Sequence, residues 1–163
     1  MRRSFVIALA LLVTAAAASA EMTVEFASKL WGLRVISLQN PGTPNAVLKA
    51  RLSAPDAQEY CDRDPGGETI EPGGPTTGKI TKKECVKRLL ATEGKKTHIF
   101  KANCPKRMIW DGSGWYQQLP PNADGEMVWQ DVRTGKVLYA DGASNHWPHN
   151  NQLQMLCPGA KVN

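Results

Sequence analysis

Two histidines close to the C-terminus are the first residues whose spacing could support chemistry. His146 and His149 stand three positions apart in "NHWPHNN", a spacing found in pairs of metal ligands. Pro148 lies between them and disfavours the helix that usually places such a pair on one face. Asp141 is the nearest acid, and none lies within the segment. We therefore expect polar loop histidines, no bound metal and no cofactor. A secreted hydrolase that uses His146 and His149 is the alternative.

The acidic stretch "YCDRDPGGE" (60–68) is a second candidate, because its carboxylates could form a calcium loop. Asp62 and Asp64 would take the first and third positions of an EF-hand loop, and Gly67 the sixth. The twelfth position needs a bidentate Glu, but Gly73 stands there. The sequence therefore favours a solvated acidic turn at the end of a helix, with Asp62 and Asp64 facing a basic helix rather than a calcium ion.

Tryptophans form the third candidate. Trp110 and Trp115 flank "DGSG" (111–114), which is typical of a hairpin turn. If this turn closes a hairpin, the two indoles face each other across the strands, and Tyr116 points to the opposite side. Packing is the ordinary role of such a pair, and the alternative is a stacking platform for a sugar ring or a peptide. Trp147 is expected to be exposed. Trp110, Trp115 and Trp147 are therefore candidate binding residues.

Charge is distributed unevenly along the chain. Residues 56–71 carry six acids and one base, whereas residues 79–107 carry ten bases and two acids. Lys82, Lys83 and Lys87 lie in the basic segment and are candidate contacts for an anionic partner. The alternative is that the two segments neutralise each other and that these lysines form a solvated helix face.

No catalytic residue is predicted. Ser113 lies in Gly112-Ser113-Gly114 rather than in the G-x-S-x-G pattern of a nucleophile elbow, and a tight turn is a poor scaffold for an oxyanion hole. We therefore expect a protein that binds rather than one that catalyses.

The first twenty residues have the pattern of a secretory signal peptide. Arg2 and Arg3 precede an apolar run of nine residues, and Ala18-Ser19-Ala20 supplies the small residues that signal peptidase accepts. The run is too short to span a bilayer as a mature helix. We assign 1–20 to a signal peptide and 21–163 to a single small secreted domain with 18 basic and 15 acidic residues, a net charge of +3. The protein is expected in the periplasm or outside the cell, without a transmembrane anchor after cleavage and without an intracellular nucleic-acid partner.

All four cysteines lie after the predicted signal peptide, and their even number indicates two disulfides in an oxidising compartment. Four cysteines allow three connectivities, and the sequence does not choose between them. We favour Cys61–Cys85, which would close a Gly/Pro-rich loop (64–78), and Cys104–Cys157, which would join the first and last C-terminal strands.

Periodicity and turn residues predict an α+β fold. Alternation indicates a hairpin from 33–39 and 46–52, and capping signals indicate helices after Ser53 and Thr81. Short strands are expected near 97–103, 107–110, 115–119, 127–132, 136–140 and 152–156. The expected architecture is an N-terminal hairpin, two short helices and a disulfide-stabilised C-terminal antiparallel sheet or small barrel.

The leading functional hypothesis is an exported, disulfide-bonded envelope protein. It would act as a binding or inhibitory module for an anionic component, a glycan or a protein. Besides the hydrolase, the remaining alternative is a structural accessory protein without a ligand of its own.

Overall fold

The computed structural model describes residues 22–26, 31–63, 80–139 and 148–160 of the 163-residue chain. The predicted signal peptide (1–20) and the Gly/Pro-rich loop (64–78) lie outside these ranges.

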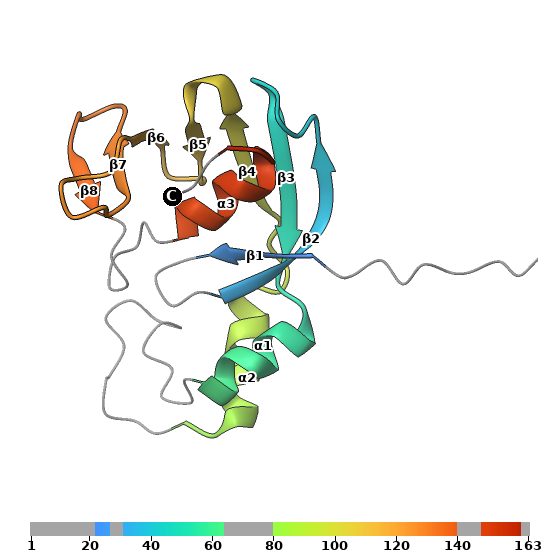
Figure 1. Cartoon of the computed structure of the whole chain (residues 1–163). Coiled ribbons are helices and arrows are strands. Elements are labelled where there is room, and N and C mark those ends of the chain that lie inside the picture. Colours follow the sequence, from blue (N-terminus) through green and yellow to red (C-terminus); the bar gives the residue numbers. More distant parts are fainter. Residues whose placement is uncertain (1–21, 27–30, 64–79, 140–147, 161–163) are drawn as a thin grey trace, which may run out of the picture.

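An antiparallel sheet of eight strands dominates the structure, and each strand pairs with the next along the chain (Figure 1). The strands are β1 (Thr23–Phe26), β2 (Trp31–Gln39), β3 (Ala46–Arg51), β4 (His98–Asn103), β5 (Met108–Trp110), β6 (Trp115–Leu119), β7 (Val128–Asp131) and β8 (Val137–Tyr139). The predicted N-terminal hairpin is confirmed as β2–β3, but β3 also pairs with β4. The hairpin is therefore part of one continuous sheet. This sheet is open, with β1 and β8 at its two edges, so the predicted alternative of a small barrel is wrong.

The two predicted helices are confirmed, together with the caps that start them. Helix α1 (Ala54–Arg63) follows Ser53, whose backbone N–H donates to Asp56 Oδ2 at 3.2 Å while Asp56 N–H donates to Ser53 Oγ at 3.3 Å. Helix α2 (Lys82–Thr92) follows Thr81, whose Oγ1 accepts from the N–H of Glu84. Such bonds satisfy backbone donors that have no partner within the first turn of a helix.

A third helix, α3 (Pro148–Leu156), replaces the strand predicted over 152–156, so that prediction is wrong. Pro148 is the first residue of α3, where a missing N–H costs nothing because no carbonyl stands ready to accept it. After the buried Pro148, four more side chains of α3 are buried with helical spacing, namely His149, Gln152, Leu153 and Leu156. Two of the four are polar, and this concealed the amphipathic pattern from a count of apolar residues.

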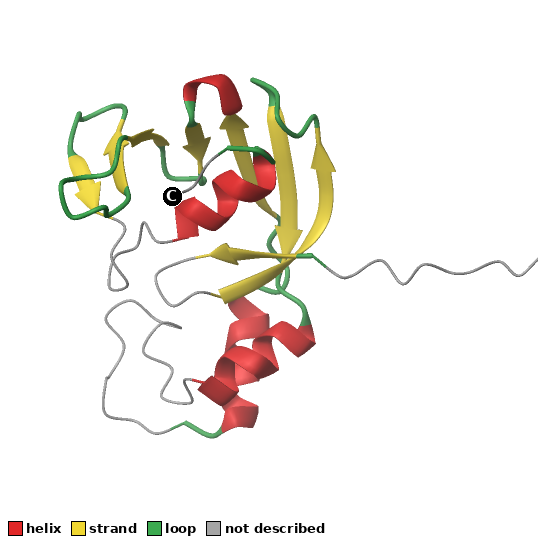
Figure 2. Cartoon of the chain, in the orientation of Figure 1, coloured by secondary structure: helices red, strands yellow, loops and turns green. Residues whose placement is uncertain are grey.

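The core lies between the sheet and α3, which contacts β1, β3, β4 and β5, and it continues into the α1–α2 pair through the buried Cys61, Cys85 and Leu89. Phe100, Leu48 and Ile109 from the sheet are fully or almost fully buried, as are Leu153 and Leu156 from α3. Figure 2 shows α1 and α2 below the sheet in this view, where α1 packs against α2 and β2. The helices therefore occupy two separate places, with α3 on the sheet and the α1–α2 pair at one end of it.

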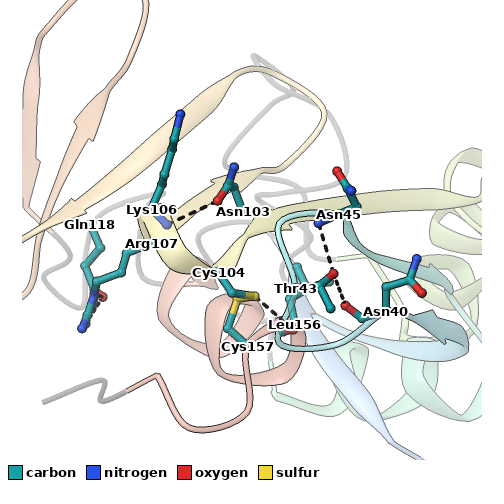
Figure 3. Close-up of a disulfide and its surroundings, with 10 residues drawn as sticks. All are labelled: Asn40, Thr43, Asn45, Asn103, Cys104, Lys106, Arg107, Gln118, Leu156 and Cys157. Atoms are coloured by element: carbon teal, nitrogen blue, oxygen red, sulfur yellow. Dashed lines mark hydrogen bonds between the residues drawn. A yellow bond between two sulfur atoms is a disulfide. The ribbon is translucent and has the colours of Figure 1, made fainter.

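Both predicted disulfides are confirmed. Cys61–Cys85 joins α1 to α2 with Cα atoms 6.0 Å apart. Cys104–Cys157 joins the short 3₁₀ helix η1 (Cys104–Lys106) to the residue after α3, with Cα atoms 5.4 Å apart (Figure 3). The β2–β3 turn packs beside the second bridge, where Cys104 N–H donates to Thr43 O at 3.2 Å and Gly42 N–H donates to Leu156 O at 2.8 Å.

Candidate functional site

The middle of the sheet presents two faces of different character. Along β3, Ala46, Leu48 and Ala50 are buried, whereas Lys49 and Arg51 are exposed. Side chains alternate between the two faces of a strand, so the same division continues through the paired strands. We call the second side the outward face; it consists of Val47, Lys49, Arg51, Ile99, Lys101, Asn103, Met108, Trp110, Trp115, Gln117 and Leu119.

Trp110 and Trp115 pair directly across the β5–β6 ladder, as predicted. Tyr116 pairs with Ile109 on the opposite side, where both are buried, which confirms the predicted division of this hairpin. The register continues to β4, where Lys101 is the partner of Trp110. Lys101, Trp110 and Trp115 therefore form one row across three neighbouring strands.

The two tryptophans of this row differ in their surroundings. Lys101 Nζ lies over the Trp110 ring, 4.9 Å from its centroid, which is the geometry of a cation–π contact. Trp110 is half-buried, whereas Trp115 is 37% exposed. One indole thus holds an ammonium group in place, and the next leaves part of its surface open to a ligand.

The outward face is cationic. Lys49, Arg51 and Lys101 are exposed on it, and the ladder positions of the described strands β3–β6 on this side contain no carboxylate. Sequence reasoning counted Lys101 only within the basic segment and did not consider Lys49 or Arg51. The signal that could have found them is the alternation in "AVLKAR" and "HIFKAN", which places Lys49 and Arg51, two residues apart, and Lys101 on the polar side of their strands.

The three lysines predicted to bind an anion lie on α2, away from the tryptophans. Figure 1 shows α2 at the bottom of the view and β4–β6 towards the top. Lys82 Nζ is 2.5 Å from Asp62 Oδ1, so the acidic end of α1 faces the basic helix as predicted. Lys87 Nζ lies 3.9 Å from Glu84 Oε2. The lysines of α2 and the tryptophans of the hairpin therefore do not form one site.

Lys82 and Lys83 line a cleft of about 400 Å³ beside α1, together with Gln58 and Val86. Lys82 is engaged by Asp62 there, and the positive charge of the cleft is correspondingly reduced. Lys82 therefore fits the alternative in which the acidic and basic segments neutralise each other.

His149 is not the polar loop histidine that the sequence predicts: it lies in α3, buried in a hydrogen-bonded cluster with Asp111, Ser113 and Tyr116. His149 is 2% exposed, and its Nε2 lies 3.0 Å from Asp111 Oδ2. The Ser113 hydroxyl donates to Asp111 Oδ1 at 2.7 Å and lies 2.9 Å from the Tyr116 hydroxyl. In a catalytic triad the histidine stands between serine and acid, whereas here the carboxylate stands between the other two. His149 is therefore not placed to take a proton from Ser113.

The same hydrogen bonds control the ionisation of Asp111. Burial by itself would raise the pKa of its carboxyl group. The bonds from His149 and from the side chain and backbone of Ser113 outweigh burial and lower the pKa of Asp111 to about 2. Asp111 is thus a carboxylate over the ordinary pH range and a poor general base, which fits a structural role at the hairpin turn.

Several residues named from the sequence lie outside the described part of the chain, namely Asp64, Asp141, His146 and Trp147. Within the described residues, no group of three or more His, Cys, Asp or Glu side chains could hold a metal ion. None of the helices in these residues has the length and apolar character needed to cross a membrane. The two disulfides are compatible with a protein that functions outside the cytoplasm.

No protein-family model, curated protein or solved structure matches this chain.

Proposed function

We propose that this protein is an exported binding module of the periplasm or the cell exterior that holds an anionic partner on the outward face of β3–β6. One observation carries this function: Lys101, Trp110 and the exposed Trp115 stand in a row on this face. A cation beside an open aromatic surface binds groups that combine negative charge with an apolar surface.

Two features support a binding role over a catalytic one. The described strands β3–β6 place neither a carboxylate nor a histidine on the outward face, so this face has no acid–base pair. His149, which the hydrolase would use, is 2% exposed and bonded to Asp111. Two disulfides and a predicted leader are typical of small proteins that function in an oxidising compartment.

Charge supports an anionic ligand in particular. A group of like charges on one face attracts oppositely charged ligands over distances comparable with the Debye length, about 8 Å at physiological ionic strength. Lys49, Arg51 and Lys101 supply such a group on the outward face, while Lys82 on α2 is paired with Asp62.

A pair of double variants tests the location of the site. Lys49→Ala/Lys101→Ala and Lys83→Ala/Lys87→Ala each remove two positive charges, the first from the sheet and the second from α2. Binding of the purified protein to immobilised heparin and to polyphosphate is measured as a function of salt. We expect the sheet variant to lose most of its affinity and the α2 variant to keep it. Equal losses, a loss confined to the α2 variant, or no binding of either polyanion by the unchanged protein would contradict the proposal.

A further inference from the structure

We infer that the ligand of the outward face is an acidic polysaccharide, with one sugar ring stacked on Trp115 and a neighbouring carboxylate held by Lys101. This inference rests on the proposed function and names its ligand class. The geometry of the Lys101–Trp110–Trp115 row and its surroundings points to it.

Trp115 supplies the surface for a ring. It is 37% exposed, although its cross-strand partner Trp110 is half-buried. The apolar C–H face of a sugar packs well on an indole, because the ring removes apolar surface from water and its C–H groups meet the negative face of the π system. Polyphosphate has no such ring, so the open indole favours a carbohydrate over a purely ionic polymer.

Trp110 has a different task, which is to position the cation. Lys101 Nζ lies 4.9 Å from the centroid of the Trp110 ring, so the ammonium group is held against the sheet and its freedom is reduced before a ligand arrives. Neighbouring strands are about 4.8 Å apart, which places the backbones of Lys101 and Trp115 about 10 Å from each other. A chain that stacks on Trp115 therefore brings the substituents of its next residues to Lys101.

The density of cations on the face argues against a nucleic acid. Lys49 and Lys101 are diagonal neighbours on β3 and β4, because Lys101 pairs with Val47 and Lys49 with Ile99. Their Cβ atoms are then about 7 Å apart. A nucleic-acid strand carries one charge every 3.4 Å or so and is bound by many Lys and Arg contacts. The described outward face has three exposed cations, Lys49, Arg51 and Lys101, which is fewer than such a strand would engage. This number fits a polymer with fewer charges, such as one with a single carboxylate per sugar.

Amide side chains lie beside the tryptophans and suit the hydroxyl groups of a sugar. Asn103, Met108 and Gln117 form the adjacent row, in which Asn103 pairs with Met108 and Met108 with Gln117. Gln130 of β7 continues this row as the partner of Gln117. Amides both donate and accept hydrogen bonds, as hydroxyl groups require. A poly-acidic peptide offers carboxylates but neither rings nor hydroxyl groups, so it uses only the lysines.

The test compares four probes by isothermal titration calorimetry with the purified protein. Oligogalacturonate carries rings and carboxylates, its methyl ester keeps the rings without the charge, polyglutamate keeps the charge without the rings, and oligothymidylate represents nucleic acid. We expect oligogalacturonate to bind best and its methyl ester about tenfold more weakly, as expected for the loss of a charge-assisted contact. No binding of oligogalacturonate, or equal or tighter binding of polyglutamate or oligothymidylate, would overturn the inference. If one of these other polyanions binds in a manner sensitive to Lys49→Ala/Lys101→Ala, the proposed function stands and only the sugar is wrong.

Three variants separate the roles of the row. Trp115→Ala should weaken oligogalacturonate and its methyl ester alike, by about fivefold to tenfold, and Trp115→Phe should keep most of the affinity. Trp110→Leu should weaken the charged probe about threefold and leave the methyl ester unchanged, because only the position of the Lys101 ammonium is lost. Equal effects of Trp110→Leu on both probes would contradict its role in positioning, and an effect of Trp115→Ala on the charged probe alone would contradict stacking.

Discussion

Nε2 of His149, on α3, lies 3.0 Å from Oδ2 of Asp111. Asp111 is the first residue of the turn between β5 and β6. Asp111 also accepts hydrogen bonds from the backbone N–H of Ser113 at 2.9 Å and of Gly114 at 3.3 Å, so a single carboxylate organises the turn and anchors it to the C-terminal helix. Trp110 and Trp115 stand on either side of this turn. The contact therefore stiffens the hairpin that displays the proposed ligand-binding residues.

Asp111 makes the stability of the protein sensitive to acid. Because the pKa of Asp111 is lowered to about 2 from an ordinary value of 3.8, its stabilisation is complete above pH 3.8 and is lost as the pH falls towards 2. The shift corresponds to about 2 kcal/mol of unfolding free energy. Asp111→Asn should therefore be less stable than the unchanged protein by about this amount at pH 5.5, and the gap should narrow at pH 2.5. Denaturant unfolding measures it, with the exposed Asp124→Asn as control; a gap that does not depend on pH would contradict the assignment.

Two side chains of α3 bond the free edge of β1 and provide a matched pair of substitutions. Asn151 Oδ1 accepts from Glu25 N–H at 3.0 Å, and Gln152 Nε2 donates to Glu25 O at 3.0 Å. Asn151→Asp keeps an acceptor for the N–H, whereas Gln152→Glu removes the donor and turns a carboxylate towards a carbonyl oxygen. We expect Gln152→Glu to cost about 2–4 kcal/mol of unfolding free energy and Asn151→Asp less than about 1 kcal/mol. Thermal and denaturant unfolding check this, and similar losses for the two variants would contradict the geometry.

His98 makes the stability fall on mild acidification. Burial lowers the pKa of His98 below its ordinary value of 6.5, with Lys96 acting in the same direction and Glu93 opposing both. The neutral ring, which packs 4.4 Å from Phe26, is thus favoured in the fold, and its stabilisation is present above pH 6.5 and lost as the pH falls through the folded pKa. His98→Phe should reduce the decrease in Tm between pH 8 and pH 5. Glu93→Gln should enlarge it, because the carboxylate that favours the charged ring is gone. If the decrease in Tm between pH 8 and pH 5 is the same in both variants as in the unchanged protein, His98 is not the cause of the loss of stability in acid.

The two disulfides should contribute differently to stability and to ligand binding. Cys104–Cys157 closes a sequence separation of 53 and Cys61–Cys85 one of 24, which on the chain-entropy account correspond to about 4 and about 3.5 kcal/mol. Cys104–Cys157 also secures α3 to the sheet, so its double alanine variant should lose more unfolding free energy. The Cys61/Cys85 double alanine variant should keep its affinity for oligogalacturonate, because α1 and α2 lie away from the outward face. A loss of affinity in that variant would place the site elsewhere.

Local features of the chain were readable without the tertiary structure. The caps at Ser53 and Thr81 depend on a side chain and a backbone N–H three residues apart, so they were predicted correctly. The Trp110–Trp115 pair follows from the turn between them and the two-residue period of strands. The pairing of the cysteines was predicted from the elements that each bridge would join, and both bridges are present.

Two features, the helical state of residues 152–156 and the position of Lys101 beside Trp110, depend on contacts that no local sequence pattern contains. Residues 152–156 of α3 alternate like a strand, because the polar His149 and Gln152 interrupt the apolar stripe of the helix. Both are nevertheless buried, since Asp111 and the backbone of Glu25 bond to them. The position of the cation at the proposed site also depends on the pairing of strands that are distant in the sequence. Lys101 lies nine residues from Trp110 in the sequence, and only the β4–β5 register brings its ammonium group over the indole. The sequence by itself determined where α1 and α2 begin and how the β5–β6 hairpin alternates, because those preferences act over a few residues. Burial of polar groups and the meeting of side chains from different strands were decided by the fold, because their partners are supplied by distant parts of the chain.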